Sequence, residues 1–189
     1  MIKTFALKIF ALCTLCCCGL TLTAQLPQQR PTTATSEPLR VNNVYLGVNG
    51  GVSIPFSNLA TTRTIGGFGQ AEIFVFVTEN ITVGADFAYH YFPGKDNLVN
   101  IAMQEVLING AFYFKSSWNP HISLGLGYYG EPGTSHFGMV PGIGIMPKIA
   151  NNIYFTARAS TAFFNMDGHF FKISAGVTFM VYRHKPIKK

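Results

Sequence analysis

The sequence predicts an all-β chain that folds as an eight-stranded antiparallel up-and-down barrel spanning a membrane. Eight segments of about a dozen residues alternate apolar and polar side chains, as transmembrane strands do. The connections between them alternate between short and long. Charged residues make up 12% of the chain, against about 25% in an ordinary soluble domain. A chain this apolar is suited to lipid rather than to water.

The first 24 residues are predicted to be a secretory signal peptide. Lys3 and Lys8 form a charged start, an apolar stretch covers 9–22, and Ala24 precedes Gln25 at the expected cleavage site. The apolar stretch is short for a membrane-spanning helix, which needs about 20 residues. We therefore expect a secreted chain that begins at Gln25.

All four cysteines lie inside the predicted signal peptide, at Cys13, Cys16, Cys17 and Cys18. The mature chain is then expected to have no disulfide and no thiol chemistry. A lipid anchor on Cys18 is the alternative, because Leu15 stands three positions before it as a lipoprotein signal requires. Against it, Cys16 and Cys17 occupy the positions where small residues are usual.

The rest of the chain is predicted to be one domain with two short extensions. Residues 25–42 contain three prolines and no periodicity, which predicts a disordered leader. Residues 43–182 are the predicted barrel, and 183–189 form a basic tail that we expect in the periplasm. Part of the net charge of +6 lies in this tail. The sequence contains no basic patch interleaved with aromatic residues, so nucleic-acid binding is not predicted.

The strands follow from the period-2 segments. They are predicted at 43–54, 65–77, 80–92, 102–115, 120–129, 136–148, 152–164 and 169–182. The clearest places Ile81, Val83 and Phe87 on one face, with Asp86 and His90 on the other. By the same alternation, further apolar side chains are expected to contact lipid: Phe155, Ile173 and Val177.

The connections predict how the barrel is oriented. Residues 78–80, 116–119 and 149–152 are tight turns, whereas 55–64, 93–101 and 130–135 are longer. Short periplasmic turns and longer outer loops are typical of transmembrane barrels, and an even strand number returns both termini to the periplasm.

Two strands contain irregular features. Pro141 and Pro147 interrupt the sixth strand, where we expect a bulge or a strand end, since proline cannot donate to a ladder. In the second strand an inward Glu72 also turns Phe74 and Phe76 inward, so a bulge that flips the register is expected.

Aromatic residues gather near both ends of the strands, which predicts belts at the two membrane interfaces. Ordinary packing of aromatics in the core is the alternative, since aromatics favour strands in any case. The expected members are Phe76, Phe114, Trp118, Tyr154 and Tyr182 at the turn end, and Tyr89, Tyr91, Phe92, Tyr128 and Tyr129 at the loop end.

The polar strand faces favour a membrane barrel over a soluble, lipocalin-like one. Apart from Lys115 and Lys148 at the last positions of two strands, their only charges are Glu72, Asp86, Glu105, Arg158 and Lys172, with small residues between them. A surface facing water would carry far more charge. These faces are therefore expected to line a narrow lumen.

The pattern from 43 to 182 resembles the small OmpA/OmpX-type outer-membrane barrels and the outer-membrane protein β-barrel domain families. The last strand, 174–181, is similar to the β-signal that the barrel-assembly machinery reads, although 183–189 follow it. The resemblance implies an outer-membrane location and a monomer. It also implies outer-membrane lipids, lipopolysaccharide and the assembly machinery as partners.

The inward charges sort into two levels above the periplasmic turns. The lower level is expected to hold Glu72, Asp86 and Arg158 with Asn49 and Asn109, and the upper level Glu105, Lys172 and His90. A lone ion in a narrow, low-dielectric lumen costs several kcal/mol. We therefore predict Arg158 beside Asp86 or Glu72, and Lys172 beside Glu105, as a salt-bridge network that plugs the lumen.

The leading functional hypothesis is a non-catalytic barrel whose outer loops, 56–64 and 93–100, contact a ligand, a partner or a surface. A small permease for apolar molecules with a lateral opening is the alternative, favoured by a gap in the ladder near Pro141. A lipid hydrolase using His121 and Ser123, with Glu131 as the acid, is the third. The spacing of His121 and Ser123, with one residue between them, resembles the His-x-Ser spacing of the outer-membrane lipid A deacylases. No cofactor and no metal site are expected.

Overall fold

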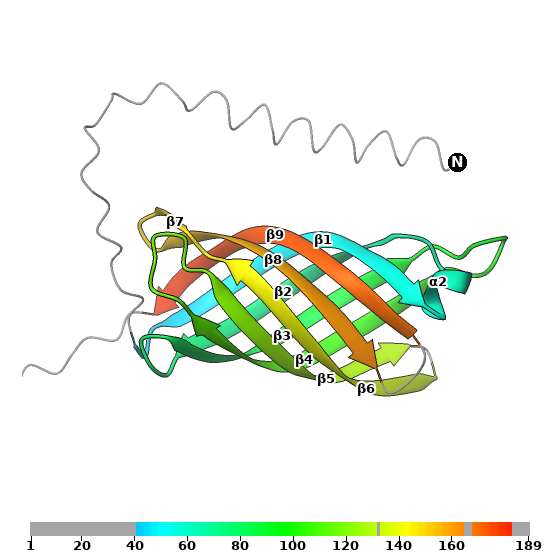
Figure 1. The fold of residues 1–189 in the computed structure, drawn as a ribbon, viewed down its shortest axis with the longest axis horizontal. Coiled ribbons are helices and arrows are strands. Elements are labelled where there is room, and N and C mark those ends of the chain that lie inside the picture. The colour runs from blue at the N-terminus through cyan, green and yellow to red at the C-terminus, as the bar shows by residue number, and fades with distance from the viewer. Residues whose placement is uncertain (1–40, 132, 165–167, 183–189) are drawn as a thin grey trace, which may run out of the picture. The chain divides into compact units, whose positions relative to one another are not determined.

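The computed structural model describes residues 41–131, 133–164 and 168–182, which form a closed antiparallel barrel (Figure 1). The predicted signal peptide (1–24), residues 25–40 of the predicted leader and the tail (183–189) lie outside the described residues. Within the described ranges, no helix has the length and apolar character needed to cross a membrane.

The described residues contain nine strands and one short helix. They are β1 (Val44–Ser57), α2 (Leu59–Thr62), β2 (Gly66–Phe76), β3 (Ile81–Phe92), β4 (Ile101–Tyr113), β5 (His121–Glu131), β6 (Thr134–Ile145), β7 (Lys148–Ala150), β8 (Ile153–Phe164) and β9 (Gly168–Tyr182).

The ring has eight positions, because β6 and β7 share one of them. Each long strand pairs antiparallel with the next, β6 pairs with β8, and β1 pairs with β9 from Val44 to Ser57. The three-residue β7 continues the line of β6 and pairs with the start of β8. The predicted eight-stranded closed barrel, with its first and last strands paired, is confirmed.

The register of β2 corrects one expectation. Its pairings with β1 and β3 run without a shift, so the bulge expected in this strand is wrong. Phe74 and Phe76 do point into the lumen with Glu72 and are buried. The reason is that the turn end of the lumen is filled by aromatic rings, which pack against both phenylalanines.

Pro141 and Pro147, at the sixth strand position of the ring, have different effects on the ladder. At Pro141 the register with β5 and β8 does not shift, so no bulge forms there. Instead the β6–β8 pairings skip Val140 and Pro141 and resume at Gly142, because proline lacks the N–H that the ladder needs. At Pro147 the strand ends, and β7 begins at Lys148.

The outer wall is apolar. Ile81, Val83, Phe87, Phe155 and Ile173 are exposed, and Val177 is half-buried on the same face. An exposed apolar surface that extends around the barrel is anomalous for a soluble monomer and suits contact with lipid.

The aromatic belts are only partly as expected. Six of the ten named residues are exposed at the two ends of the wall: Phe114, Trp118 and Tyr182 at the turn end, and Tyr89, Tyr91 and Tyr128 at the loop end. The other four are buried inside the barrel, so their assignment to the belts is wrong: Phe76, Tyr154, Phe92 and Tyr129. Alternation along each strand turns these four inward.

Candidate functional site: the lumen

The lower ionic cluster joins β2, β3 and β8 across the lumen. Glu72 and Asp86 stand directly opposite each other in the β2–β3 ladder, which brings two carboxylates together. The Arg158 guanidinium reaches both: Nη2 donates to Glu72 Oε2 at 2.8 Å, and Nη1 lies 3.7 Å from Asp86 Oδ2. A planar guanidinium can hold two acceptors at once, which offsets the repulsion between them.

The upper ionic cluster joins β1, β3, β4 and β9. Lys172 Nζ donates to both carboxylate oxygens of Glu105, at 2.7 and 2.8 Å. His90 Nε2 lies 3.3 Å from Glu105 Oε2, and its Nδ1 is 3.0 Å from the hydroxyl of Ser53. All four side chains are buried. Lys172, Glu105 and the Ser53 hydroxyl thus each have a hydrogen-bonding partner on another strand, as burial requires, whereas His90 Nε2 lies near Glu105 without a hydrogen bond.

The two predicted asparagines point inward but take different places. Asn109 lines the same small cavity as Asp86 and Arg158. Asn49 is buried beside Gly176 on β9. A side chain at position 176 would collide with the Asn49 amide. The structure therefore brings seven of the eight predicted residues to the two ionic clusters or their cavity, and Asn49 packs against the wall.

An aromatic layer closes the lumen at the turn end. Tyr45 stacks on Phe74, with ring centroids 5.2 Å apart and planes 3° from parallel. It also contacts the edges of Phe76 and Tyr154. Tyr113 and Met146 complete this turn-end layer.

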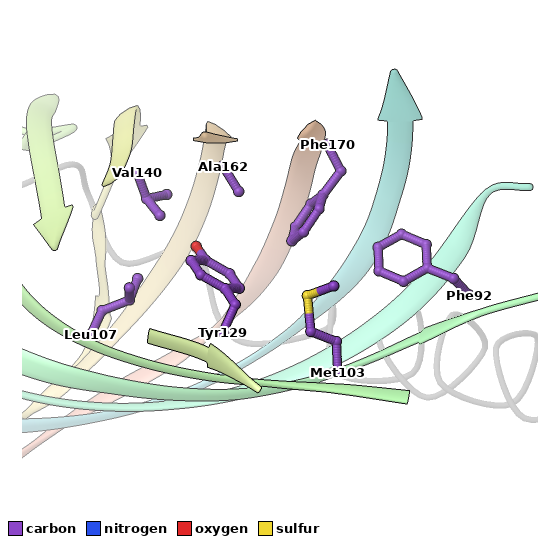
Figure 2. Close-up of a cluster of buried hydrophobic side chains, with 7 residues drawn as sticks. All are labelled: Phe92, Met103, Leu107, Tyr129, Val140, Ala162 and Phe170. Atoms are coloured by element: carbon purple, nitrogen blue, oxygen red, sulfur yellow. The ribbon is translucent and has the colours of Figure 1, made fainter. Parts of the chain in front are cut away.

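A second apolar layer fills the loop end (Figure 2). Its members come from six strands and are Phe92, Met103, Leu107, Tyr129, Val140, Ala162 and Phe170. Phe170 is central, because its ring packs against Phe92, Tyr129 and Phe164. Leu59 of α2 also packs against this loop-end layer.

Sequence reasoning missed both layers. It assigned the inward face to small and polar residues, yet the layers occupy the same inward alternation as the charges. The signal was present in the sequence. Phe74 and Phe76 share the parity of Glu72, and Phe92 shares that of His90. These aromatics stand near strand ends, which suggested interface belts instead.

The cavity described between the layers is small. A cavity of about 20 Å³ lies among Glu72, Asp86, Asn109 and Arg158. That is room for about one water molecule. The lumen of the described barrel therefore consists of two ionic clusters between two apolar layers.

The candidate hydrolase residues do not assemble. His121 and Ser123 both point into the lumen from the start of β5, with the His121 ring 4.6 Å from that of Tyr113. Glu131 ends the same strand, about 33 Å away at the usual rise per residue. The carboxylates nearer to His121, Glu72 and Asp86, are engaged by Arg158. Within 41–131, 133–164 and 168–182, no group of three or more potential metal ligands is present.

Two outer loops form one joined platform at the loop end. The amide of Thr64 donates to Pro93 O and that of Lys95 to Thr62 O, both at 3.0 Å. The Lys95 ammonium also donates to Ala60 O. Between these bonds, Arg63 and Gly94 form an isolated bridge. The platform, defined here as 58–65 with 93–100, exposes apolar side chains at its edge, with Val99 83% exposed.

Comparison with solved structures matches this geometry to one class of protein. The barrel of neisserial surface protein A superimposes with a TM-score of 0.57 at 13% identity, covering 72% of this chain and 96% of that one. The chain has the fold of a small outer-membrane β-barrel.

Other solved outer-membrane barrels agree. The attachment invasion locus protein Ail of Yersinia pestis gives a TM-score of 0.55 at 11% identity, covering 74% of this chain and 99% of that one. OprG of Pseudomonas aeruginosa gives 0.51 at 12%, covering 75% and 98%. No family model and no curated protein sequence matches the chain. The likeness therefore concerns the barrel fold.

Proposed function

We propose that this protein is a non-catalytic outer-membrane barrel whose lumen is a structural plug and whose outer loops contact a partner or a surface. The observation that carries the proposal is the filled lumen. Two buried ionic clusters lie between two apolar layers, with about 20 Å³ of free cavity among the charges. An ion crossing this lumen would lose its hydration, which costs several kcal/mol without compensation.

The joined loops support a role on the outer face. Bonds between the two loops hold the backbone of the platform in one arrangement, while Ile65, Leu98 and Val99 remain exposed. An ordered loop pair with exposed apolar side chains is suited to binding, since little ordering entropy is lost on contact. Two of the similar structures are described as a neisserial surface protein and an attachment invasion locus protein. Those words describe those proteins and only motivate the proposal here.

Conductance in planar lipid bilayers tests the plug. The wild-type barrel is expected to show negligible steady conductance. The double variant Phe74→Ala, Arg158→Ala removes one ring of the turn-end layer and the cation of the lower cluster, and is expected to conduct measurably. Lys115→Ala, at an exposed turn, serves as the control and is expected to stay closed. Steady ion current through the wild-type protein would contradict the plug.

One observation favours a permease for apolar molecules as a second candidate. The β6–β8 pairings are interrupted at Val140 and Pro141. Behind this interruption lie Val140 and Ala162 of the apolar loop-end layer (Figure 2). An apolar solute that entered from the outer loops could therefore leave into the membrane through this part of the wall without meeting a charge.

A disulfide across the interruption distinguishes the two candidates. Pro141→Cys with Thr161→Cys would fasten β6 to β8, because these positions face each other in the register that both sides of the interruption share. If the protein is a permease, oxidation should reduce the uptake of an apolar fluorophore into cells, and reduction should restore it. If the lumen is only a plug, uptake should be the same in both states and in cells lacking the protein.

A further inference from the structure

The lipid-facing wall carries a hollow of about 540 Å³ where β5, β6, β8 and β9 lie side by side. Its outward side chains are apolar. Ala157 and Ala159 of β8 lie in it, surrounded by the larger Ile122, Ile143, Ile173 and Phe114. The hollow arises because two successive outward positions of β8 are alanines, while three of their four neighbours in the ladders are isoleucines.

The register shows how the hollow is bounded. Ala159 stands between Ile143 of β6 and Ile173 of β9, and Ala157 stands between Ile145 and Ala175. A short methyl group flanked by longer side chains leaves a depression in the wall. In lipid, such a depression loses dispersion contacts unless a flexible apolar chain fills it.

The wall is thin at this place. Gly144 of β6 faces Arg158 of β8, and both residues border the hollow. Glycine contributes no side chain, and the His121 ring lies against the inward side of Gly144, so the backbone and this ring separate the hollow from the lower ionic cluster. An occupant of the hollow would therefore also cover the lower ionic cluster from the side.

We propose that this hollow seats one acyl chain of a phospholipid from the leaflet at the turn end of the barrel. The proposal rests on the outer-membrane location given above. Its volume lies within the range of small-molecule sites, about 300–1,000 Å³. A stable contact with a second copy would instead need about 1,000 Å² or more of complementary surface.

The turn end supplies the surroundings that a phospholipid headgroup requires. The hollow reaches Phe114 and Pro120, which flank the turn at 116–119. Trp118 in that turn is 61% exposed, and the Lys115 ammonium lies at the same end, beside Glu79. Indole rings and ammonium groups are typical of the headgroup level, where the ammonium is attracted to phosphate. A chain in the hollow would thus have its headgroup near Trp118.

Native mass spectrometry tests the proposal on the whole protein. The barrel is purified in a mild non-ionic detergent and mixed with vesicles of phosphatidylethanolamine and phosphatidylglycerol. The wild type is expected to retain one phospholipid. Ala159→Phe fills the hollow and should abolish that retention. Ala85→Phe is the matched control, since Ala85 is likewise an outward alanine, exposed where Ala159 is half-buried, on β3 at the opposite side of the ring.

Both variants are first checked for folding by their heat-modifiable migration in gels, because a lipid-facing phenylalanine should be tolerated at either position. Retention by the wild type and Ala85→Phe, with loss in Ala159→Phe, would support the proposal. A wild type that holds no phospholipid, that holds lipopolysaccharide instead, or that appears as a dimer would overturn it. So would equal retention in both variants. Bilayer conductance tests the plug separately, so failure of one idea does not imply failure of the other.

Discussion

Arg158 is the residue on which the lower half of the lumen depends. The β2–β3 ladder places Glu72 opposite Asp86, so these two carboxylates cannot avoid each other. Arg158 comes from β8, on the far side of the barrel, and contacts both. Its guanidinium therefore links strands that share no backbone hydrogen bonds. Arg158 therefore connects opposite sides of the barrel and also neutralises the charge of the two carboxylates.

Removing the Arg158 guanidinium should strongly destabilise the barrel. Arg158→Ala leaves two buried carboxylates without a cation, and breaking a buried pair in this way costs about 3–5 kcal/mol. Urea unfolding in detergent micelles, followed by the fluorescence of the single tryptophan, measures the loss. Arg158→Lys should recover only part of it, since an ammonium cannot contact two carboxylates with a planar fork.

An exposed pair provides the control for that experiment. Lys115 donates to Glu79 at 2.6 Å, and both side chains are more than half exposed. The hydrogen bond from Lys115 and its charge hold the pKa of Glu79 below the usual carboxyl value. The small contribution to stability is therefore present above that usual value and is lost as the pH falls. Lys115→Ala should change the unfolding free energy only slightly, since solvent screens an exposed pair. A loss equal to that of Arg158→Ala would contradict the special role of the buried cluster.

At the scale of the strands, the alternation of apolar and polar residues predicted where the strands lie better than it predicted where each side chain sits in the barrel. The period-2 alternation located the eight long strands within a few residues, but it placed a turn at 149–152, where the short β7 reaches Ala150. The inward charges of β2, β3, β4, β8 and β9 lie on the lumen face. Alternation cannot say at what height a side chain sits, because tilt and shear displace the strands. The four inward rings are expected in the interface belts because they stand near strand ends, although alternation along each strand turns them into the lumen. The break at Pro147 was expected, whereas the unshifted ladder at Pro141 depends on neighbours that the sequence does not reveal.

Some glycines in the strands allow the backbone of a neighbouring strand to approach closely. A Cβ on Gly127 of β5 would collide with the backbone of Val106 on β4, whereas a Cβ on Gly69 of β2 would meet no atom within 4 Å. Gly127→Ala should therefore cost about 1–3 kcal/mol through overpacking. Gly69→Ala should be neutral or slightly stabilising, because alanine loses less conformational freedom on folding. The same urea titration measures both, and equal effects would show that the close approach at Gly127 is unimportant.

At the scale of the whole molecule, the barrel has two chemically different ends. Tight turns, Trp118 and Lys115 mark one end, and the joined loop platform marks the other. If the platform faces the outside of the cell, both termini of the barrel lie in the periplasm, as the alternation of loop lengths predicts.

Cysteine labelling on intact cells tests this orientation. Removal of the predicted signal peptide would leave a chain without cysteine, so single cysteines can be introduced without background. A membrane-impermeant maleimide should label Val99→Cys in the platform. It should not label Asn151→Cys, in the exposed turn between β7 and β8, until the outer membrane is permeabilised. Labelling of Asn151→Cys alone on intact cells would show the reverse orientation.

The closure between β1 and β9 has a consequence for how the protein is made. Val44 pairs with Tyr182, so the ladder that seals the ring joins residues at opposite ends of the barrel sequence. This ladder cannot form until the last strand has been synthesised, and contacts between distant residues slow folding because the long loop must close first. Until the ring closes, β1 and then β9 each present an unpaired edge, and such edges are prone to aggregation. The chain therefore depends on being kept unfolded in transit, and its final step is the meeting of its first and last strands.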